Sequence, residues 1–142
     1  MNDETKAATK RKAQKTGHVF DLETRTTAFA EAIIKFTLEL PHDHPVLQPL
    51  IRQLVRSGTS IGANYCEANN ASSPADFAHK IGLCRKESRE TMYWLRLLGK
   101  AWRPALPAAR AHWRECRELH LIFSTIFHKC RQSRPSSSKP DV

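Results

Sequence analysis

The sequence predicts an all-α fold: an antiparallel, up-down-up-down four-helix bundle with disordered basic tails. Two observations predict it. Three proline-bearing interruptions, at residues 41–45, 69–74 and 103–107, divide the body of the chain into four segments, because proline ends one helix and is tolerated in the first turn of the next. Within each segment, apolar residues recur at alternating steps of three and four, as in amphipathic helices packed side by side. Short connections favour antiparallel neighbours.

Each segment has its own series of expected core positions. The first series is Leu22, Thr26, Phe29, Ile33, Phe36 and Leu40. The second is Leu47, Ile51, Leu54, Gly58, Ile61, Tyr65 and Ala68. The third is Phe77, Ile81, Cys84, Ser88, Thr91, Leu95 and Leu98, and the fourth is Trp113, Cys116, His120, Phe123, Phe127 and Cys130. The third helix has the clearest start, because Ser73 can cap it, Pro74 suits its first position and Asp76 suits its positive dipole end.

Small and polar residues interrupt the apolar pattern in the middle of the second helix. Residues 57–63 include two glycines, which each cost a helix about 1 kcal/mol against alanine, so we expect another helix backbone to approach closely there. The polar residues at spacings of three, four and three lie on one face: Ser57, Ser60, Asn64 and Glu67. We expect them to form a hydrogen-bonded polar seam between helices, and a ligand site is the alternative.

Composition is that of a globular chain, with 40% apolar and 26% charged residues. We expect a disordered basic tail at 1–19, a four-helix bundle domain at 20–132 and a disordered tail at 133–142. The longest charge-free apolar-rich run, residues 119–127, is far shorter than the roughly 20 residues of a membrane span, and the N-terminus has no apolar signal segment. These features predict a cytoplasmic protein without a membrane span. The four widely separated cysteines suggest no disulfide framework.

The second and third segments carry a recognisable signature. Residues 52–68 (RQLVRSGTSIGANYCEA), together with residues 76–80 and 86–95, resemble the bacterial four helix bundle family, which includes proteins encoded in intervening sequences of large-subunit rRNA genes. The resemblance runs from about Asp21 to Phe127. The same fold serves the accessory variability determinant of diversity-generating retroelements, a homopentameric basic barrel that binds nucleic acid and a reverse transcriptase. The resemblance implies an antiparallel bundle, assembly into a homopentamer and no known enzymatic activity.

The net charge of +9 divides equally, with +3 on each of residues 1–19, 20–127 and 128–142, but within the body the positive charge is concentrated in one stretch. Residues 85–117 hold nine basic groups and three acids, so the rest of the body is net acidic. At helical spacing the basic residues form stripes, which are our candidate nucleic-acid contacts: Arg85, Arg89, Arg96, Lys100 and Arg103 on the third helix, Arg110, Arg114 and Arg117 on the fourth, and Arg52 and Arg56 on the second. Arginine stripes can grip phosphate oxygens without reading sequence. A solvated face with nearby glutamates is the alternative.

Metal and catalytic chemistry find little support in the sequence. His112, Cys116 and His120 recur every four residues, but two of them belong to the core series and a zinc site needs a closed ligand set. His42 and His44 are best explained as turn residues. No nucleophile elbow, phosphate-cradling glycine loop or H-E-x-x-H helix is present. We therefore expect no enzyme, no cofactor and no metal.

Apolar residues beyond the core series predict a homo-oligomer, because they widen the apolar stripe beyond what one bundle needs, and the family resemblance implies that it is a pentamer. The expected interface includes Tyr93, Trp94, Leu97 and Trp102, with Leu83, Leu119, Ile122 and Ile126 beside them. The first functional hypothesis is a non-enzymatic oligomeric accessory protein that binds RNA or DNA backbone through basic helix faces. The alternative is a homo-oligomeric interaction scaffold, for example for a reverse transcriptase, that does not bind nucleic acid directly.

Overall fold

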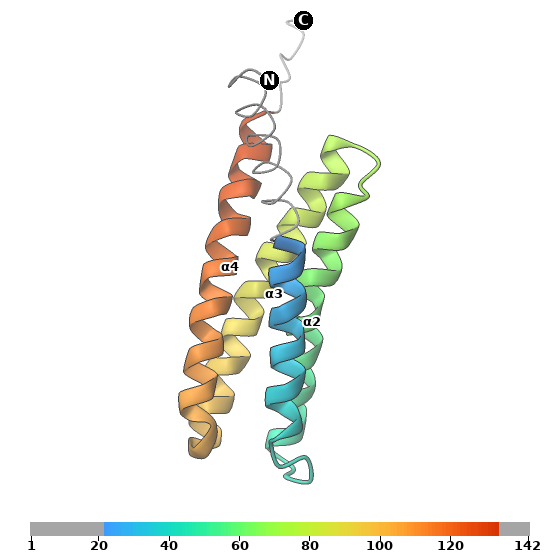
Figure 1. Ribbon diagram of the computed structural model, residues 1–142. Coiled ribbons are helices and arrows are strands. Elements are labelled where there is room, and N and C mark those ends of the chain that lie inside the picture. The colour runs from blue at the N-terminus through green and yellow to red at the C-terminus, as the bar shows by residue number, and fades with distance from the viewer. Residues whose placement is uncertain (1–21, 134–142) are drawn as a thin grey trace, which may run out of the picture.

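Four antiparallel helices make up the computed structural model, which describes residues 22–133 (Figure 1). The first helix spans residues 22–38, and it is followed by α2 (Leu47–Asn69), α3 (Pro74–Ala101) and α4 (Leu106–Gln132). A short 3-10 turn, η1 (Arg103–Ala105), joins the last two. Each helix runs opposite to the one before it, which confirms the predicted all-α bundle. The expected disordered tails, residues 1–19 and 133–142, lie outside the described residues except for Ser133.

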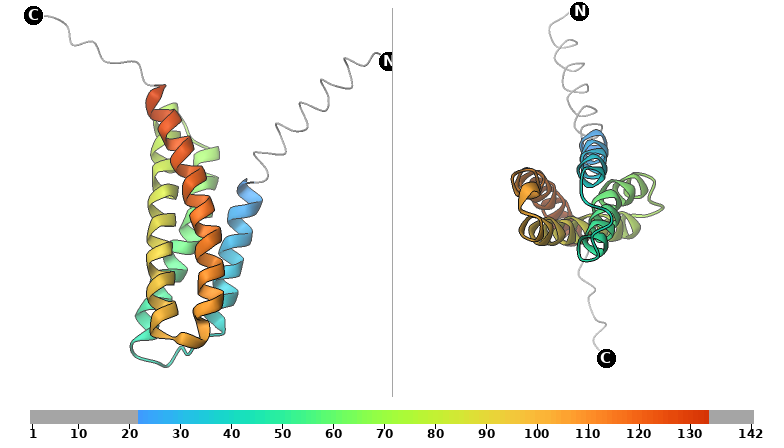
Figure 2. Two further views of the ribbon diagram at one scale, coloured as in Figure 1. Left: turned by 90° about the vertical axis from the view of Figure 1, so that its left-hand side faces the viewer. Right: turned by 90° about the horizontal axis from the view of Figure 1, so that it is seen from below.

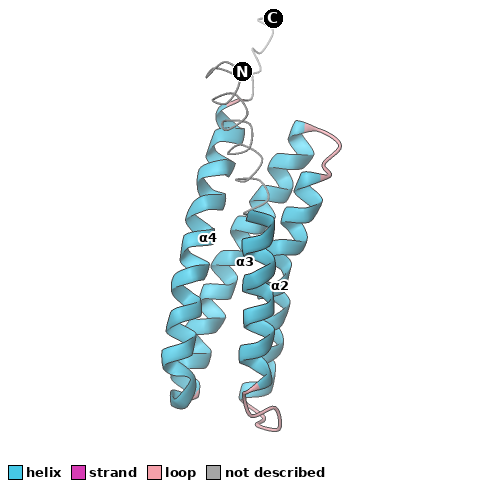
Figure 3. Cartoon of the chain, viewed as in Figure 1, coloured by secondary structure: helices cyan, strands magenta, loops and turns pink. Residues whose placement is uncertain are grey.

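The connections lie at the two ends of the bundle, and the described residues contain helices and loops but no strand (Figure 3). Seen end-on, the first helix lies between α2 and α4, across the bundle from α3 (Figure 2). Side-chain contacts agree with this view. Arg25 Nε of the first helix pairs with Glu115 Oε1 of α4 at 2.6 Å, and the Phe36 and His112 rings lie 5.1 Å apart.

Local sequence signals set the helix ends. The Ser73 hydroxyl accepts a hydrogen bond from the Asp76 N–H at 3.0 Å and Pro74 occupies the first turn, as predicted for the start of α3. The α2 start has no side-chain cap on its own N-cap residue. Instead, the His44 ring accepts the N–H of Val46 at 3.1 Å, which confirms the turn role of this histidine.

The core follows the predicted series closely in the first three helices. Every residue of the second series is buried, as are all but the first member of the first and third series. The fourth helix differs from the prediction. Leu119 is fully buried in the core rather than part of a surplus apolar face, whereas His120 of the predicted series is only half-buried. The cause is the rotation of α4 about its axis, which turns Cys116, Leu119 and Phe123 toward the core. The buried positions therefore follow steps of three and then four, where the predicted series followed steps of four and then three.

The small residues of α2 make room for the first helix. A Cβ atom on Gly58 would lie 3.1 Å from Ile33 Cγ2, and one on Gly62 would lie 3.2 Å from Thr26 Oγ1. Both distances are tighter than ordinary van der Waals contact. The expected close helix approach is therefore made by the first helix, and it explains why the two glycines stand at core positions.

Candidate nucleic-acid interface

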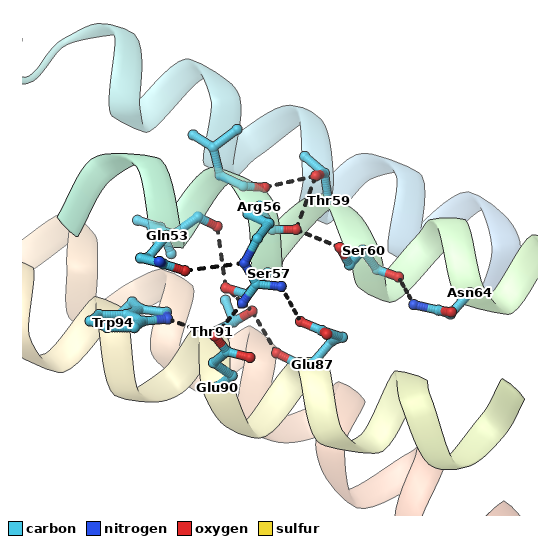
Figure 4. Close-up of polar contacts among 12 residues, drawn as sticks. Gln53, Arg56, Ser57, Thr59, Ser60, Asn64, Glu87, Glu90, Thr91 and Trp94 are labelled. Atoms are coloured by element: carbon cyan, nitrogen blue, oxygen red, sulfur yellow. Dashed lines mark hydrogen bonds and ion pairs between the residues drawn. The ribbon is translucent and has the colours of Figure 1, made fainter. Parts of the chain in front are cut away.

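Polar side chains line the contact between α2 and α3 (Figure 4). Ser57 and Thr91 are fully buried, and the Thr91 hydroxyl donates to Ser57 Oγ at 2.9 Å. Thr91 Oγ1 also lies 2.7 Å from the Glu87 carbonyl oxygen. No buried side-chain polar atom in the described part of the chain lacks a hydrogen-bond partner. This pair therefore locks two helices together through satisfied hydroxyl groups.

The other members of the expected seam find partners of two kinds. The Ser60 hydroxyl donates to the Arg56 carbonyl at 2.6 Å, and the Asn64 amide donates to the Ser60 carbonyl at 2.8 Å, both within α2. Glu67 lies at the surface, where Lys80 Nζ of α3 approaches its carboxylate to 2.7 Å. The four residues thus share a face, but only Ser57 and Glu67 have side-chain partners on another helix.

Arg56 is held by carboxylates rather than presented to solvent alone (Figure 4). Its guanidinium pairs with Glu87 at 3.4 Å and, at closer range, with Glu90, and its Nε donates to Gln53 Oε1 at 3.1 Å. The pKa of Arg56 is raised, chiefly by the hydrogen bond to Glu90. Of the two cations expected on α2, Arg52 is exposed and forms no ion pair within residues 22–133, whereas Arg56 already has anionic partners on α3.

The Glu90 carboxylate joins both sides of the α2–α3 contact, because it accepts hydrogen bonds from Arg56 of α2 and from Trp94 of α3. Burial raises its pKa, but hydrogen bonds from Arg56 and from the Trp94 indole, which donates at 3.2 Å, outweigh burial and hold the pKa below its usual value. Glu90 is therefore an anion that links α2 to α3.

Most of the basic residues on α3 and α4 point to solvent. Within residues 22–133, no ion pair or side-chain hydrogen bond involves the following exposed cations: Arg89, Arg96, Lys100, Arg103, Arg110, Arg114 and Arg117. Arg85 differs, because it is half-buried and its guanidinium carbon lies 5.1 Å from the centre of the Phe127 ring. These cations lie in the halves of α3 and α4 nearest their connection, which are the lower halves in Figure 1. The fold therefore gives this region a high density of positive charge that no carboxylate within the described residues pairs with.

A groove of about 550 Å³ lies between these two cationic helix segments. Arg96 and Lys100 of α3 line it on one side, and Arg110 and Arg114 of α4 line it on the other. Trp113, a member of the predicted core series, is half-buried and packs against the core, and it also lines the groove. The signal that could have found it is its position between Arg110 and Arg114 on the same helix.

The four residues expected at an oligomer interface differ in exposure. Tyr93 is 54% exposed, and its ring packs edge-on against Trp94 with 5.0 Å between ring centres. Trp94 and Trp102 are half-buried and pack against the core, and Leu97 is half-buried. Tyr93 is thus the member of this group whose ring is available to a partner without any change in the bundle.

The histidine and cysteine series of α4 is divided between core and edge. Burial lowers the pKa of His112 and raises the pKa of Cys116. The Cys116 thiol donates a hydrogen bond to the Ser88 carbonyl oxygen at 3.1 Å. His120 Nδ1 lies 3.1 Å from the Ser88 hydroxyl. Among residues 22–133, no three His, Cys, Asp or Glu side chains gather as a metal site would require.

No helix in the described ranges is long and apolar enough to cross a lipid bilayer.

Comparison with known proteins gives a family match and a structural match. The model of the family described as 23S rRNA-intervening sequence protein matches residues 20–102. A crystal structure from Bacteroides thetaiotaomicron VPI-5482, a protein of unknown function from the S23 ribosomal protein family, is 31% identical, covers 75% of this chain and 97% of its own, and superposes with a TM-score of 0.66. No curated protein matches the chain.

Proposed function

Because the chain belongs to the 23S rRNA-intervening sequence protein family, we propose that it is a non-enzymatic, oligomeric accessory protein that binds the phosphate backbone of RNA or DNA. The observation that carries the proposal is the set of exposed cations on α3 and α4 that have no anionic partner within the described residues. Guanidinium groups bind phosphate oxygens in a forked geometry, and the counterions they displace drive association.

The cations divide into residues suited to this contact and residues that are not. Arg89, Arg96 and Arg114 are exposed and project from two neighbouring helices. Arg56 and Arg85 fit the role less well, because Arg56 would have to leave Glu90 and Arg85 would have to leave the Phe127 ring. The proposed interface is therefore centred on the lower halves of α3 and α4 rather than on α2.

The test is a salt titration of affinity for duplex DNA and for structured RNA. A triple variant, Arg89→Ser, Arg96→Ser and Arg114→Ser, removes three exposed cations from the proposed interface. The matched control, Lys35→Ser, Lys129→Ser and Arg131→Ser, removes the same charge from exposed positions far from the proposed interface. Each lost phosphate contact should flatten the slope of log K against log salt by about 0.9 on B-DNA, so we expect a slope shallower by about 2–3 in the first variant and a smaller change in the control.

A deletion variant separates the bundle from the tails. Removal of residues 1–19 and 133–142 should weaken binding without abolishing it, because the α3 and α4 cations remain. Complete loss of binding on tail deletion, with no further effect of the triple variant, would contradict the proposal for the bundle. The chain would then act as an interaction scaffold, for which the exposed Tyr93 ring offers a contact surface.

A further inference from the structure

The groove between α3 and α4 combines positive walls with an apolar floor. Beneath its four cations lie the side chains of Leu95, Leu106 and Ala109, with Trp113 beside them. The two helices meet closely at the back of the groove, where a Cβ atom on Gly99 would lie 3.1 Å from Ala109 Cβ. Its volume of about 550 Å³ is within the roughly 300–1,000 Å³ typical of small-ligand sites.

The charges of the groove are arranged in two pairs. Arg96 and Lys100 stand four residues apart on α3, and Arg110 and Arg114 stand four residues apart on α4, so each pair lies about one turn apart on its helix. No acidic residue lines the groove. Glu115 and Glu118 line a separate depression that Trp113 also lines, and Glu115 is paired with Arg25.

Phosphate contact alone does not call for such a shape. A duplex presents its phosphates on a convex surface and keeps its bases stacked inside, so a flat cationic face serves it as well as a groove. An unpaired nucleotide is different, because its base offers a flat apolar face and its flanking phosphates offer negative charge. Proteins that bind single strands combine a positive groove with aromatic side chains on which bases stack.

We propose that this groove holds an unpaired segment of RNA or DNA, with a base against Trp113 and the floor, and with flanking phosphates between the two pairs of cations. The inference rests on the proposed function and goes beyond it, because it makes the protein prefer single-stranded over fully paired nucleic acid. The groove lining carries no amide side chain of the kind that contacts adenine edges.

The test compares three probes with the full chain at one salt concentration: a ten-nucleotide single strand, a blunt duplex of the same sequence, and inorganic tripolyphosphate as competitor. RNA and DNA versions of both oligonucleotides distinguish the two sources of the ligand. We expect tighter binding of the single strand than of the duplex, and we expect tripolyphosphate to displace the duplex more readily than the single strand.

Variants at the aromatic position separate stacking from charge. Trp113→Leu should weaken single-strand binding by about 5- to 150-fold, the range that one stacked base contributes, while duplex affinity stays within about twofold. Trp113→Phe should retain most of the preference. Phe77→Leu, which removes a half-buried aromatic ring near the start of α3 and outside the groove, is the matched control and should leave it unchanged. Thermal unfolding verifies that each variant is folded.

A fluorescence measurement tests the proposal even if Trp113→Leu does not fold. In a Trp94→Phe and Trp102→Phe background, Trp113 is the one tryptophan left, and the single strand should quench it while tripolyphosphate should not. Equal quenching by both, or equal affinity for single strand and duplex with equal losses in Trp113→Leu, would overturn the groove inference and leave the proposed function standing. Absence of binding to every nucleic acid at low salt would overturn both.

Discussion

Ser57 and Thr91 show how single residues hold two helices in register. Both are fully buried, and their hydroxyl oxygens lie 2.9 Å apart across the α2–α3 contact. A buried hydroxyl that loses its partner keeps the cost of its desolvation, whereas replacing both partners with apolar groups removes that cost. The pair therefore contributes specificity to the α2–α3 contact as well as free energy.

This coupling predicts a non-additive pair of substitutions. Thr91→Val should lower the free energy of unfolding by about 1–3 kcal/mol, because Ser57 loses its partner on α3. The double variant Ser57→Ala and Thr91→Val should be less destabilised than the sum of the two single variants. Urea denaturation of the four proteins measures this difference, and strictly additive effects would show that the two hydroxyls do not interact.

At the scale of the helix, α2 carries two different contacts on neighbouring faces. Its small residues admit the first helix, with Gly62 against Thr26. Its cation Arg56 reaches across to Glu87 and Glu90 on α3. The first contact depends on side-chain volume and the second on charge, so different perturbations should affect them separately.

The volume contact is tested by adding a side chain where there is no room. Gly62→Leu should lower the free energy of unfolding by about 1–3 kcal/mol through overpacking against the buried Thr26, despite the better helix propensity of leucine. Ala63→Leu adds bulk at the next, exposed position and should change stability by less than about 0.5 kcal/mol. Chemical denaturation checks both. Similar losses in the two variants would mean that close approach at Gly62 is not the cause.

The charge contact is tested by pH. A carboxyl whose pKa is lower in the folded state stabilises the fold above its unfolded pKa, about 4.3 for glutamate, and this contribution is lost as pH falls through the folded pKa. The lowered pKa of Glu90 therefore predicts that Arg56→Met destabilises the protein at pH 7 and that the difference from wild type shrinks below about pH 4. Urea denaturation across this range measures it.

Arg52 supplies the control for this experiment, because it stands one turn before Arg56 on α2 and is exposed without an ion pair in the described residues. Arg52→Met should show no comparable dependence on pH. If the Arg56→Met difference persisted unchanged at pH 3, the contribution of Arg56 would come from the packing of its aliphatic stem rather than from Glu90.

For the whole molecule, the distribution of charge and exposed apolar surface matters most. The exposed large apolar side chains lie on several helices, with Leu38 70% exposed on the first helix and Tyr93 54% exposed on α3. Single exposed apolar residues are ordinary on a monomer. Tyr93 stands beside Trp94 and Leu97, which are also partly exposed, so this face of α3 is a candidate for contact between copies of the chain, as is the face of the first helix that carries Ile34 and Leu38.

Oligomerisation is therefore predicted to depend on the Tyr93 ring. Light scattering at micromolar concentration should give a mass several times the 16.2 kDa of one chain, with five copies expected. Tyr93→Glu should dissociate the assembly and Tyr93→Phe should not. This position is a sharper test than Trp94, because Trp94 also donates to Glu90 within the chain. A monomer mass for the wild type would contradict the prediction.

The number of helices, their antiparallel order and most of the core could be predicted from the residues alone, because proline positions and a repeat of three and four depend on local backbone geometry. The start of α3 at Ser73 and the close approach of another helix to the small residues of α2 could be predicted for the same reason. Each of these features is set within a few residues along the chain.

Which residues from different helices meet could not be predicted in this way and follows from the packing of the helices. The rotation of α4, which buries Leu119 rather than His120, depends on how four helices share one core. The pairing of Arg56 with Glu90 and the groove beside Trp113 each join positions that are distant in sequence. A helical wheel gives the face on which a residue lies but not what stands opposite that face, because packing between helices sets their rotation and their neighbours.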